Sequence, residues 1–314
     1  MKTKIFTSRK LKEPAEIIKN GGLVAFPTET VYGLGANAFD IKAVKKIFEA
    51  KGRPSDNPLI VHIAKKEQIN EIAFINPEAE KIIKKFWPGP LTIILKNKKI
   101  ISREVTGGLN TVAVRMPKNK IALKLIELSG VPIAAPSANI SGRPSGTSFE
   151  YVLNDFNGRI AGIIKSKSSE IGLESTVIDL TTKPPVLLRP GGLSFEDLKM
   201  VLPNLIISSS KNIKKTKSPG MKYKHYSPNA KIFLFGKNAK DKIESFKLKY
   251  QKLNKKIKII NTKNTKKFGK ELFDLFRKSD KEKVDIILIS SIDQNGVGLA
   301  IMNRIKKAAS KVID

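Results

Sequence analysis

The chain has 314 residues, of which 40% are hydrophobic and 28% charged, so it can bury a core and is not disordered throughout. The absence of cysteine excludes a disulfide scaffold, a thiolate zinc site, an iron–sulfur cluster and a cysteine nucleophile, and we expect a cytoplasmic protein. We expect no transmembrane helix and no signal peptide, because no run of about 18 apolar residues occurs and the start is charged.

Basic residues greatly outnumber acidic ones, with 59 Lys and Arg against 28 Asp and Glu and a net charge of +31. Such a balance permits RNA binding, but the excess is almost all Lys, spread along the chain beside many Ile and Asn, as in compositional drift. Where Lys supplies most positive charge, a retained Arg indicates a need for a planar, bidentate donor. The nine arginines are Arg9, Arg53, Arg103, Arg115, Arg143, Arg159, Arg189, Arg277 and Arg304.

Short apolar runs alternate with capped helical segments over the first two thirds of the chain, which predicts an α/β domain with a mixed sheet. The predicted strands are residues 23–27, 59–63, 91–95, 111–116, 132–136, 162–165, 175–180 and 185–189. Helices are expected after Asp40, from Asn76 to about Phe86, after Thr147, which has capping-box spacing to Glu150, and after Ser194.

Residues 206–230 have no sustained periodicity and are predicted to form a linker, whose Met, Tyr and His residues favour a function for it. From residue 231 a second, three-layer α/β unit is expected. Its strands are predicted at 230–235, 256–260 and 285–290 and its helices at 240–253, 266–280 and 299–310. It lacks GxGxxG, so we assign it no dinucleotide.

The polar residue types available for an active site favour phosphate chemistry. The chain has no GxxxxGK[ST], HExxH or GxSxG motif and only two His, so Lys, Arg, Ser, Thr, Asn and Tyr must carry the site. Lys51 and Arg53 follow a predicted helix and can clamp a polyphosphate or a carboxylate, or merely end the helix favourably. Residues 135–148, APSANISGRPSGTS, place small donors near a helix N-terminus, as in anion sites.

Other candidates are less specific. In FPTETVYGLGANA (26–38), Thr28, Thr30 and Tyr32 share one face if the chain is extended, although a glycine-rich turn is the alternative. His62 lies in an apolar strand, where a core histidine is the commoner outcome. Arg115, Ser175 and Arg189 lie at predicted strand ends.

Taken in order, PTETVYGLG, KGRPSDNPLIVH, WPGPLT, VAVRMP, APSANISGRPS, ESTVID and LRPG resemble the YrdC-type domain. SPGMKYKHYSP followed by a small α/β unit resembles the long, two-domain form of the L-threonylcarbamoyladenylate synthase family. The resemblance implies a twisted mixed sheet with a concave positive cavity. It also implies a catalytic domain at 1–205, a linker or lid at 206–230 and a Rossmann-like domain at 231–314.

The same resemblance implies a nucleotidyltransferase that converts L-threonine, bicarbonate and ATP into L-threonylcarbamoyl-AMP, diphosphate and water. Mg²⁺ would accompany ATP, and no metal site in the protein itself is expected. The product would pass to a separate transferase complex that modifies tRNA, so that tRNA is an indirect acceptor. Direct binding of RNA is left open, and no membrane is involved.

The residues implied by the resemblance fall into three groups. The catalytic pair is Lys51 and Arg53. The L-threonine pocket is Thr30, His62, Arg115, Ala135 and Ser175. The ATP site is Arg53, Asn57, Thr111, Ser137, Asn139, Ser145, Arg189 and Tyr226.

Two alternatives accompany this prediction. A non-catalytic basic module that binds RNA or tRNA would also explain the charge, and its binding would weaken steeply with salt. A related carbamoyl-adenylate chemistry serves hydrogenase maturation, but those proteins carry extra acylphosphatase-like and zinc-finger regions, for which this chain has neither the length nor the cysteines.

Overall fold

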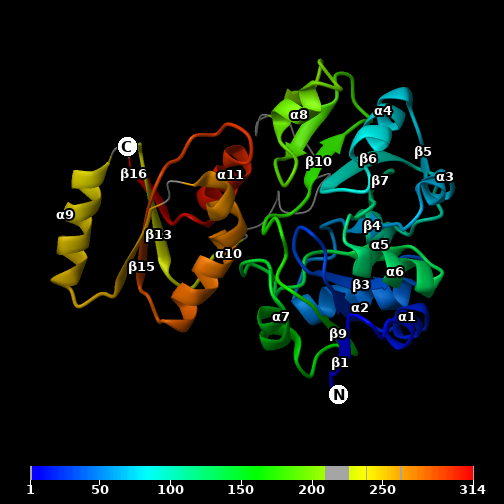
Figure 1. Cartoon of the computed structure of the whole chain (residues 1–314), viewed down its shortest axis with the longest axis horizontal. Helices are drawn as coiled ribbons and strands as arrows, with labels where there is room; N and C mark the ends of the chain where they lie inside the picture. The colour runs from blue at the N-terminus through cyan, green and yellow to red at the C-terminus, as the bar shows by residue number, and fades with distance from the viewer. Residues whose placement is uncertain (1, 209–225, 238, 262–263, 314) are drawn as a thin grey trace.

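A computed structural model describes residues 2–208, 226–237, 239–261 and 264–313. Two α/β units lie side by side along the long axis of the molecule, with the N-terminal unit at the right of Figure 1 and the C-terminal unit at the left. Within the described ranges, no helix is long and apolar enough to cross a membrane.

The first unit is built on a mixed sheet with strand order β1-β9-β2-β3-β8-β4-β7-β6-β10-β11-β12, and β5 pairs with β6. Its strands are β1 (Lys4–Thr7), β2 (Val24–Phe26), β3 (Gly33–Asn37), β4 (Ile60–His62), β5 (Ala73–Phe74), β6 (Leu91–Asn97), β7 (Thr111–Arg115), β8 (Ile133–Ala135), β9 (Gly162–Lys165), β10 (Thr176–Asp179), β11 (Val186–Arg189) and β12 (Ile206–Ile207). Its helices are α1 (Lys12–Lys19), α2 (Ile41–Lys51), α3 (Ile69–Ile72), α4 (Pro77–Phe86), α5 (Arg103–Thr106), α6 (Lys120–Ser129), α7 (Phe149–Phe156) and α8 (Phe195–Lys199), with a short 3-10 helix at Lys66–Gln68.

The strands predicted from apolar runs are all present, as β2, β4, β6, β7, β8, β9, β10 and β11. The segment 26–38 combines the two alternatives: residues 27–32 form a loop with a bend at 29–31, and residues 33–37 form β3, which pairs antiparallel with β2. A Cβ on Gly33 or Gly35 would lie within 3.0 Å of the Phe26 ring, so these glycines let an aromatic side chain cover the strand closely.

Most of the predicted helix starts are confirmed by their caps. The Asp40 side chain accepts hydrogen bonds from the backbone N–H groups of Lys42 and Ala43, and the Asn76 and Ser194 side chains cap α4 and α8. The capping box at Thr147 is wrong: α7 begins after Ser148, which makes no side-chain cap bond.

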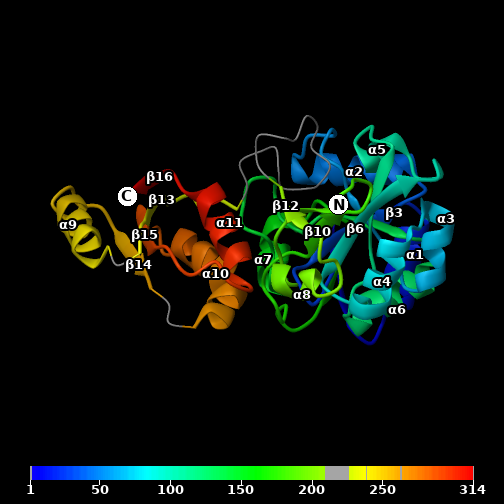
Figure 2. The same ribbon diagram turned by 90° about the horizontal axis from the view of Figure 1, so that it is seen from above.

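The second unit has a wholly parallel sheet with strand order β14-β15-β13-β16. Its elements are β13 (Lys231–Phe235), α9 (Lys240–Gln251), β14 (Ile257–Ile260), α10 (Thr265–Lys281), β15 (Ile286–Ser290), α11 (Gly298–Ala308) and β16 (Lys311–Ile313). The predicted strands and helices are all present, and β16 is additional. Helix α9 covers the outer face, whereas α10 and α11 cover the face towards the first unit (Figures 1 and 2).

The two units share an apolar cluster and buried polar contacts. Val31 and Leu173 of the first unit pack in one cluster with side chains of α10 and α11 such as Phe273 and Ile301. Arg277 of α10 donates to both oxygens of Asp155, at 3.2 and 2.7 Å. The two units therefore share buried apolar and polar contacts, as elements within one hydrophobic core do.

The predicted linker differs from the structure at its start, because Ile206 and Ile207 form β12, which extends the first sheet beside β11. Residues 209–225, which hold most of the expected lid, lie outside the described residues. The described segment resumes at Tyr226, and the Ser227 N–H donates to the Gly142 carbonyl.

Replacing Asp40 by Ala should lower the free energy of unfolding by about 1 kcal/mol, because the first turn of α2 loses the acceptor for two backbone N–H groups. Urea unfolding of the purified variant measures the change. Ser148→Ala is the matched control, since Ser148 occupies a cap position without a side-chain cap bond and its loss should change stability by less than about 0.5 kcal/mol. Equal losses in the two variants would contradict the cap assignment.

Candidate functional site

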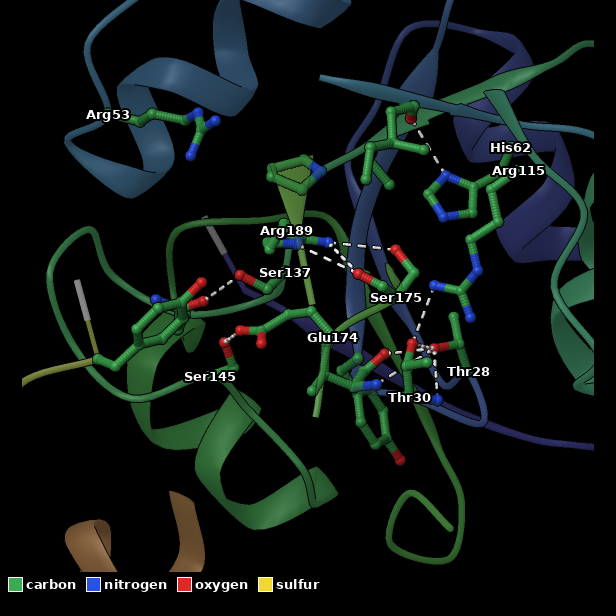
Figure 3. A pocket seen from close by; sticks show the side chains of 18 of the residues that line it. Thr28, Thr30, Arg53, His62, Arg115, Ser137, Ser145, Glu174, Ser175 and Arg189 are labelled. Atoms are coloured by element: carbon green, nitrogen blue, oxygen red, sulfur yellow. Dashed lines mark hydrogen bonds between the residues drawn. The ribbon is translucent and has the colours of Figure 1, made fainter. Parts of the chain in front are cut away.

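The predicted site residues gather in one pocket of the first unit (Figure 3). It lies where the loop between β2 and β3, the ends of β4, β7, β8 and β11, and the loop after β8 converge. Eleven of the fourteen predicted residues line it: Thr30, Arg53, His62, Arg115, Ala135, Ser137, Asn139, Ser145, Ser175, Arg189 and Tyr226. Lys51, Asn57 and Thr111 are not among its lining residues.

Arg115, at the end of β7, is the fixed cation of one end of the pocket. It is only 4% exposed, and its guanidinium donates to Glu29 Oε1 at 2.6 Å, to Thr30 Oγ1 at 2.9 Å and to the Gly89 carbonyl at 3.3 Å. A guanidinium held at three points presents its remaining face in one orientation, which suits recognition of a planar carboxylate.

The hydroxyl groups beside Arg115 form a directed chain. Thr28 Oγ1 donates to the Val31 carbonyl at 2.6 Å, and Thr28 and Thr30 share a bond of 2.8 Å. Because a threonine hydroxyl has one proton, Thr30 is the donor in the shared bond, and it accepts from Arg115. Thr30 therefore has no second proton to give a ligand and can contact it only as an acceptor.

His62 ends β4 and faces the same end of the pocket. It is 4% exposed and packs edge-on against Phe26, with ring centres 6.1 Å apart. Burial lowers the pKa of His62 to about 3, and Arg115 adds to this effect, so the ring is neutral near neutral pH. Its Nδ1–H donates to the Ile60 carbonyl at 3.1 Å, which leaves Nε2 as an acceptor.

Arg189 and Ser175 join two strands at the floor of the pocket. Arg189 Nη2 donates to the carbonyl and the hydroxyl oxygen of Ser175, at 2.9 and 3.2 Å, and the Ser175 hydroxyl lies 2.8 Å from that of Thr92. Both predicted residues are buried and line the cavity. Strand pairing of β6, β10 and β11 brings these three side chains together.

The loop after β8 carries the small polar groups expected there. Ser137 Oγ donates to Asn139 Oδ1 at 2.6 Å, and the Asn139 amide donates to the Ile140 and Arg143 carbonyls. Lys51 lies beneath this loop, 2% exposed, and its Nζ donates to the carbonyls of Ser137 and Asn139 at 2.6 and 2.5 Å. Burial, followed by the charge of Arg53, lowers the pKa of Lys51 well below its usual value.

Arg53 lies across the pocket from Thr30 and Arg115 (Figure 3). Its guanidinium donates to the carbonyls of Asn57 and Pro58, at 3.2 and 3.1 Å. Asn57 is 1% exposed, and neither polar atom of its side-chain amide has a partner among the described residues. Thr111 begins β7, at the opposite end of the strand from Arg115.

Glu174 lines the pocket but was not singled out from the sequence, although it stands in the ESTVID motif beside Ser175. Its Oε1 accepts from Ser145 Oγ at 2.6 Å and its Oε2 from Arg304 of the second unit at 3.0 Å. Tyr226 is 5% exposed and stacks on Phe273 of α10, with ring centres 5.4 Å apart. The contacts of Arg304 with Glu174 and of Phe273 with Tyr226, which connect the second unit to the pocket, are evident only from the tertiary structure.

Glu174 is the acidic residue among those that line the pocket. Both oxygens of Glu174 are already engaged, and the described residues contain no group of three His, Cys, Asp or Glu that could hold a metal.

Two family profiles match consecutive parts of the chain. One, described as "Telomere recombination" and covering Sua5, YciO and YrdC proteins, matches residues 16–191. The other, "Threonylcarbamoyl-AMP synthase, C-terminal domain", matches residues 193–310.

Relatives similar over nearly the whole chain carry one name. The chain is 49% identical to a threonylcarbamoyl-AMP synthase of Pyrococcus abyssi, covering 96% of this chain and 94% of the relative. It is 45% identical to that of Bacillus subtilis, covering 96% and 93%. The crystal structure of P. abyssi Sua5 complexed with L-threonine matches with a TM-score of 0.95 at 47% identity, covering 99% of this chain and all of the other.

His62 should make the protein less stable as the pH falls below its ordinary pKa of 6.5. The folded state keeps the ring neutral down to about pH 3, whereas the unfolded chain takes up a proton, so acid favours unfolding in this window. We expect the stability of the wild type relative to His62→Gln to fall by up to about 1.4 kcal/mol per pH unit.

Urea unfolding of both proteins between about pH 5 and 7 measures this difference. Carboxylates titrate alike in the two proteins, so they cancel in the comparison. Parallel stability curves would show that His62 is not held neutral in the folded state.

Proposed function

Because the chain belongs to the Sua5/YrdC family of threonylcarbamoyl-AMP synthases, we propose that its pocket makes L-threonylcarbamoyl-AMP and diphosphate from L-threonine, bicarbonate and ATP. This is the first step towards threonylcarbamoyladenosine in tRNA, with the product passing to a separate transferase. The comparisons give no support to the alternative of a non-catalytic RNA-binding module.

One observation carries the proposal: most of the motif residues expected to bind threonine and ATP converge on one pocket, whose charged lining residues are four arginines and one glutamate, although they come from distant parts of the sequence. A relative of the same fold is described in complex with L-threonine. An amino-acid carboxylate and a triphosphate are both anionic, so a pocket with arginines at opposite ends fits the pair of substrates.

We assign the threonine end to Arg115, Thr30 and His62, with Ala135 and Ser175 completing it. Arg115 would bind the carboxylate, since its guanidinium is already fixed by Glu29. Thr30 and neutral His62 Nε2 can only accept, so they suit the donors of threonine, its hydroxyl and amino groups.

We assign the nucleotide end to Arg53 and Arg189 with the small polar residues of the loop after β8. Two further residues would complete the nucleotide end: Tyr226, and Asn57, whose buried side-chain amide has no partner among the described residues. We also propose that Thr111 belongs to the nucleotide end. Lys51 would act beneath the site by holding the Ser137 and Asn139 carbonyls.

The chemistry needs positioning and charge neutralisation rather than a covalent intermediate. The threonine amine attacks bicarbonate to give a carbamate and water. A carbamate oxygen then attacks the α-phosphorus of ATP, forming one P–O bond while the bond to diphosphate breaks. Arg53 and Arg189 would offset the charge that develops on the phosphates. We propose that Mg²⁺ enters bound to those phosphates.

Diphosphate release from ATP should require both L-threonine and bicarbonate, and L-serine should replace threonine poorly. Arg53→Ala should slow release about 100-fold, because a fixed cation is removed from the phosphates. A coupled diphosphate assay measures both results. Arg9→Ala is the control, since Arg9 is exposed and is not among the residues that line the pocket. Release without threonine would reject the proposed function.

Arg115→Lys should raise KM for L-threonine at least about tenfold while changing KM for ATP much less. A lysine keeps the charge but has only three donors on one nitrogen atom, so it cannot bind Gly89, Glu29, Thr30 and a carboxylate at once. The same assay, with threonine and ATP varied in turn, measures both constants. An equal rise in the two KM values would show that Arg115 supports the pocket as a whole instead.

A further inference from the structure

Arg304 of α11 reaches from the second unit into the wall of the pocket. It is 0% exposed, and its Nε and Nη2 each lie 3.0 Å from Glu174 Oε2. Nη1 donates to the Pro190 carbonyl at 2.5 Å. The guanidinium also lies over the Tyr226 ring, 5.4 Å from its centre. A planar, multi-donor group is needed to make these contacts together.

Glu174 links Arg304 to the cavity. Its carboxylate is buried, with one oxygen facing Arg304 and the other accepting from the Ser145 hydroxyl. Burial by itself raises the pKa of Glu174, but the charges of Arg304 and Arg189 and the bond from Ser145 together hold that pKa below its ordinary value. Glu174 is therefore ionised near neutral pH and can only accept hydrogen bonds.

The ionised carboxylate determines what Ser145 can offer a ligand. A serine hydroxyl has one proton, and that of Ser145 is directed at Glu174 Oε1, 2.6 Å away. Only the lone pairs of Ser145 Oγ remain for the cavity. Phosphate oxygens are acceptors, so they cannot bond to Ser145 in this state. The donors of ATP are its ribose hydroxyls and the amino group of adenine.

We infer that Arg304 is a positioning residue for nucleotide recognition: by engaging Glu174 it turns the Ser145 proton away from the ligand, so that Ser145 accepts a hydrogen bond from a ribose hydroxyl or the adenine amine. This inference rests on the proposed function, because Ser145 belongs to the ATP site only by that proposal. It gives the second unit a part in nucleotide recognition, which Arg304 exerts through Glu174 and Ser145.

The isosteric change Glu174→Gln separates this role from packing. The Gln carbonyl would take over the bonds from Arg304, and its NH₂ group would donate to Ser145 Oγ. The Ser145 proton would then be released towards the cavity, and the hydroxyl would no longer require a donor on the ligand. Arg304→Met removes one of the charges that lower the pKa of Glu174, so that pKa rises, and a proton taken up on Oε1 would donate to Ser145 Oγ as the Gln amide does.

The experiment compares ATP with 2′-deoxy-ATP, 3′-deoxy-ATP and purine riboside triphosphate, each of which lacks one donor. Calorimetry gives the affinities, and diphosphate release gives KM for the nucleotide and for threonine. In the wild type, one analogue should bind about 3- to 10-fold more weakly than ATP, which identifies the group that Ser145 contacts. Ser145→Ala, Glu174→Gln and Arg304→Met should each reduce that ratio below about 2-fold, with KM for threonine little changed.

Tyr151→Phe is the matched control. It removes the hydrogen bond from Tyr151 to Asp274, which joins the same two units away from the pocket lining, and should leave the analogue ratio at the wild-type value. Thermal unfolding verifies that each variant is folded, and if Arg304→Met is not, Glu174→Gln decides the question.

The inference would be overturned if a folded Glu174→Gln protein kept the wild-type ratio of affinities for ATP and the analogue. It would also be overturned if the wild type bound all three analogues with the same affinity as ATP. If threonine-dependent turnover persists with unaltered ratios, the inference fails while the proposed function stands. Nucleotide discrimination that depends on Glu174, without threonine-dependent turnover, would reject the proposed function and retain the role of Arg304.

Discussion

A buried guanidinium must place its donors on oxygen atoms, because an unpaired charge in the interior costs several kcal/mol. Arg115, Arg189 and Arg304 are each at most 4% exposed and meet this requirement with Glu29, the Ser175 carbonyl and Glu174 respectively. The pairs of Arg115 and Arg304 connect segments that are distant in sequence, and the pair of Arg189 connects two neighbouring strands. The positions of the pocket walls follow from these pairs.

The same requirement joins the two units. Arg277 donates to the Pro144 carbonyl and to Asp155, and Arg304 donates to Glu174, so the residue before Ser145 and the side-chain partner of Ser145 are both held from the second unit. An apolar cluster that includes Leu173 surrounds these contacts and keeps water from competing with them. The second unit is thus structurally continuous with the site.

Much of the fold could be predicted from local pattern, since short apolar runs between turn residues mark strands reliably. Strand β3 was not among the predicted strands, because its sequence is rich in glycine and its apolar partner, the Phe26 ring, comes from the neighbouring strand. The cap of α7 was misplaced by one residue, since Ser and Thr at successive positions offer equivalent local signals. Glu174 was overlooked because nothing local distinguishes a buried acidic residue from an exposed one.

The sequence by itself determined many of the strands and helices, the two-unit organisation and a set of motif residues, because these depend on periodicity, caps and short-range spacing. It also indicated that arginines kept in a lysine-rich chain would make bidentate contacts, as Arg277 does with Asp155. Only the tertiary structure decided which charges are paired, which hydroxyls can donate and which side chains of the second unit reach the pocket. Those properties depend on burial and on partners that folding brings together, such as Glu174 for Arg304, 130 residues away, and the local sequence does not reveal either.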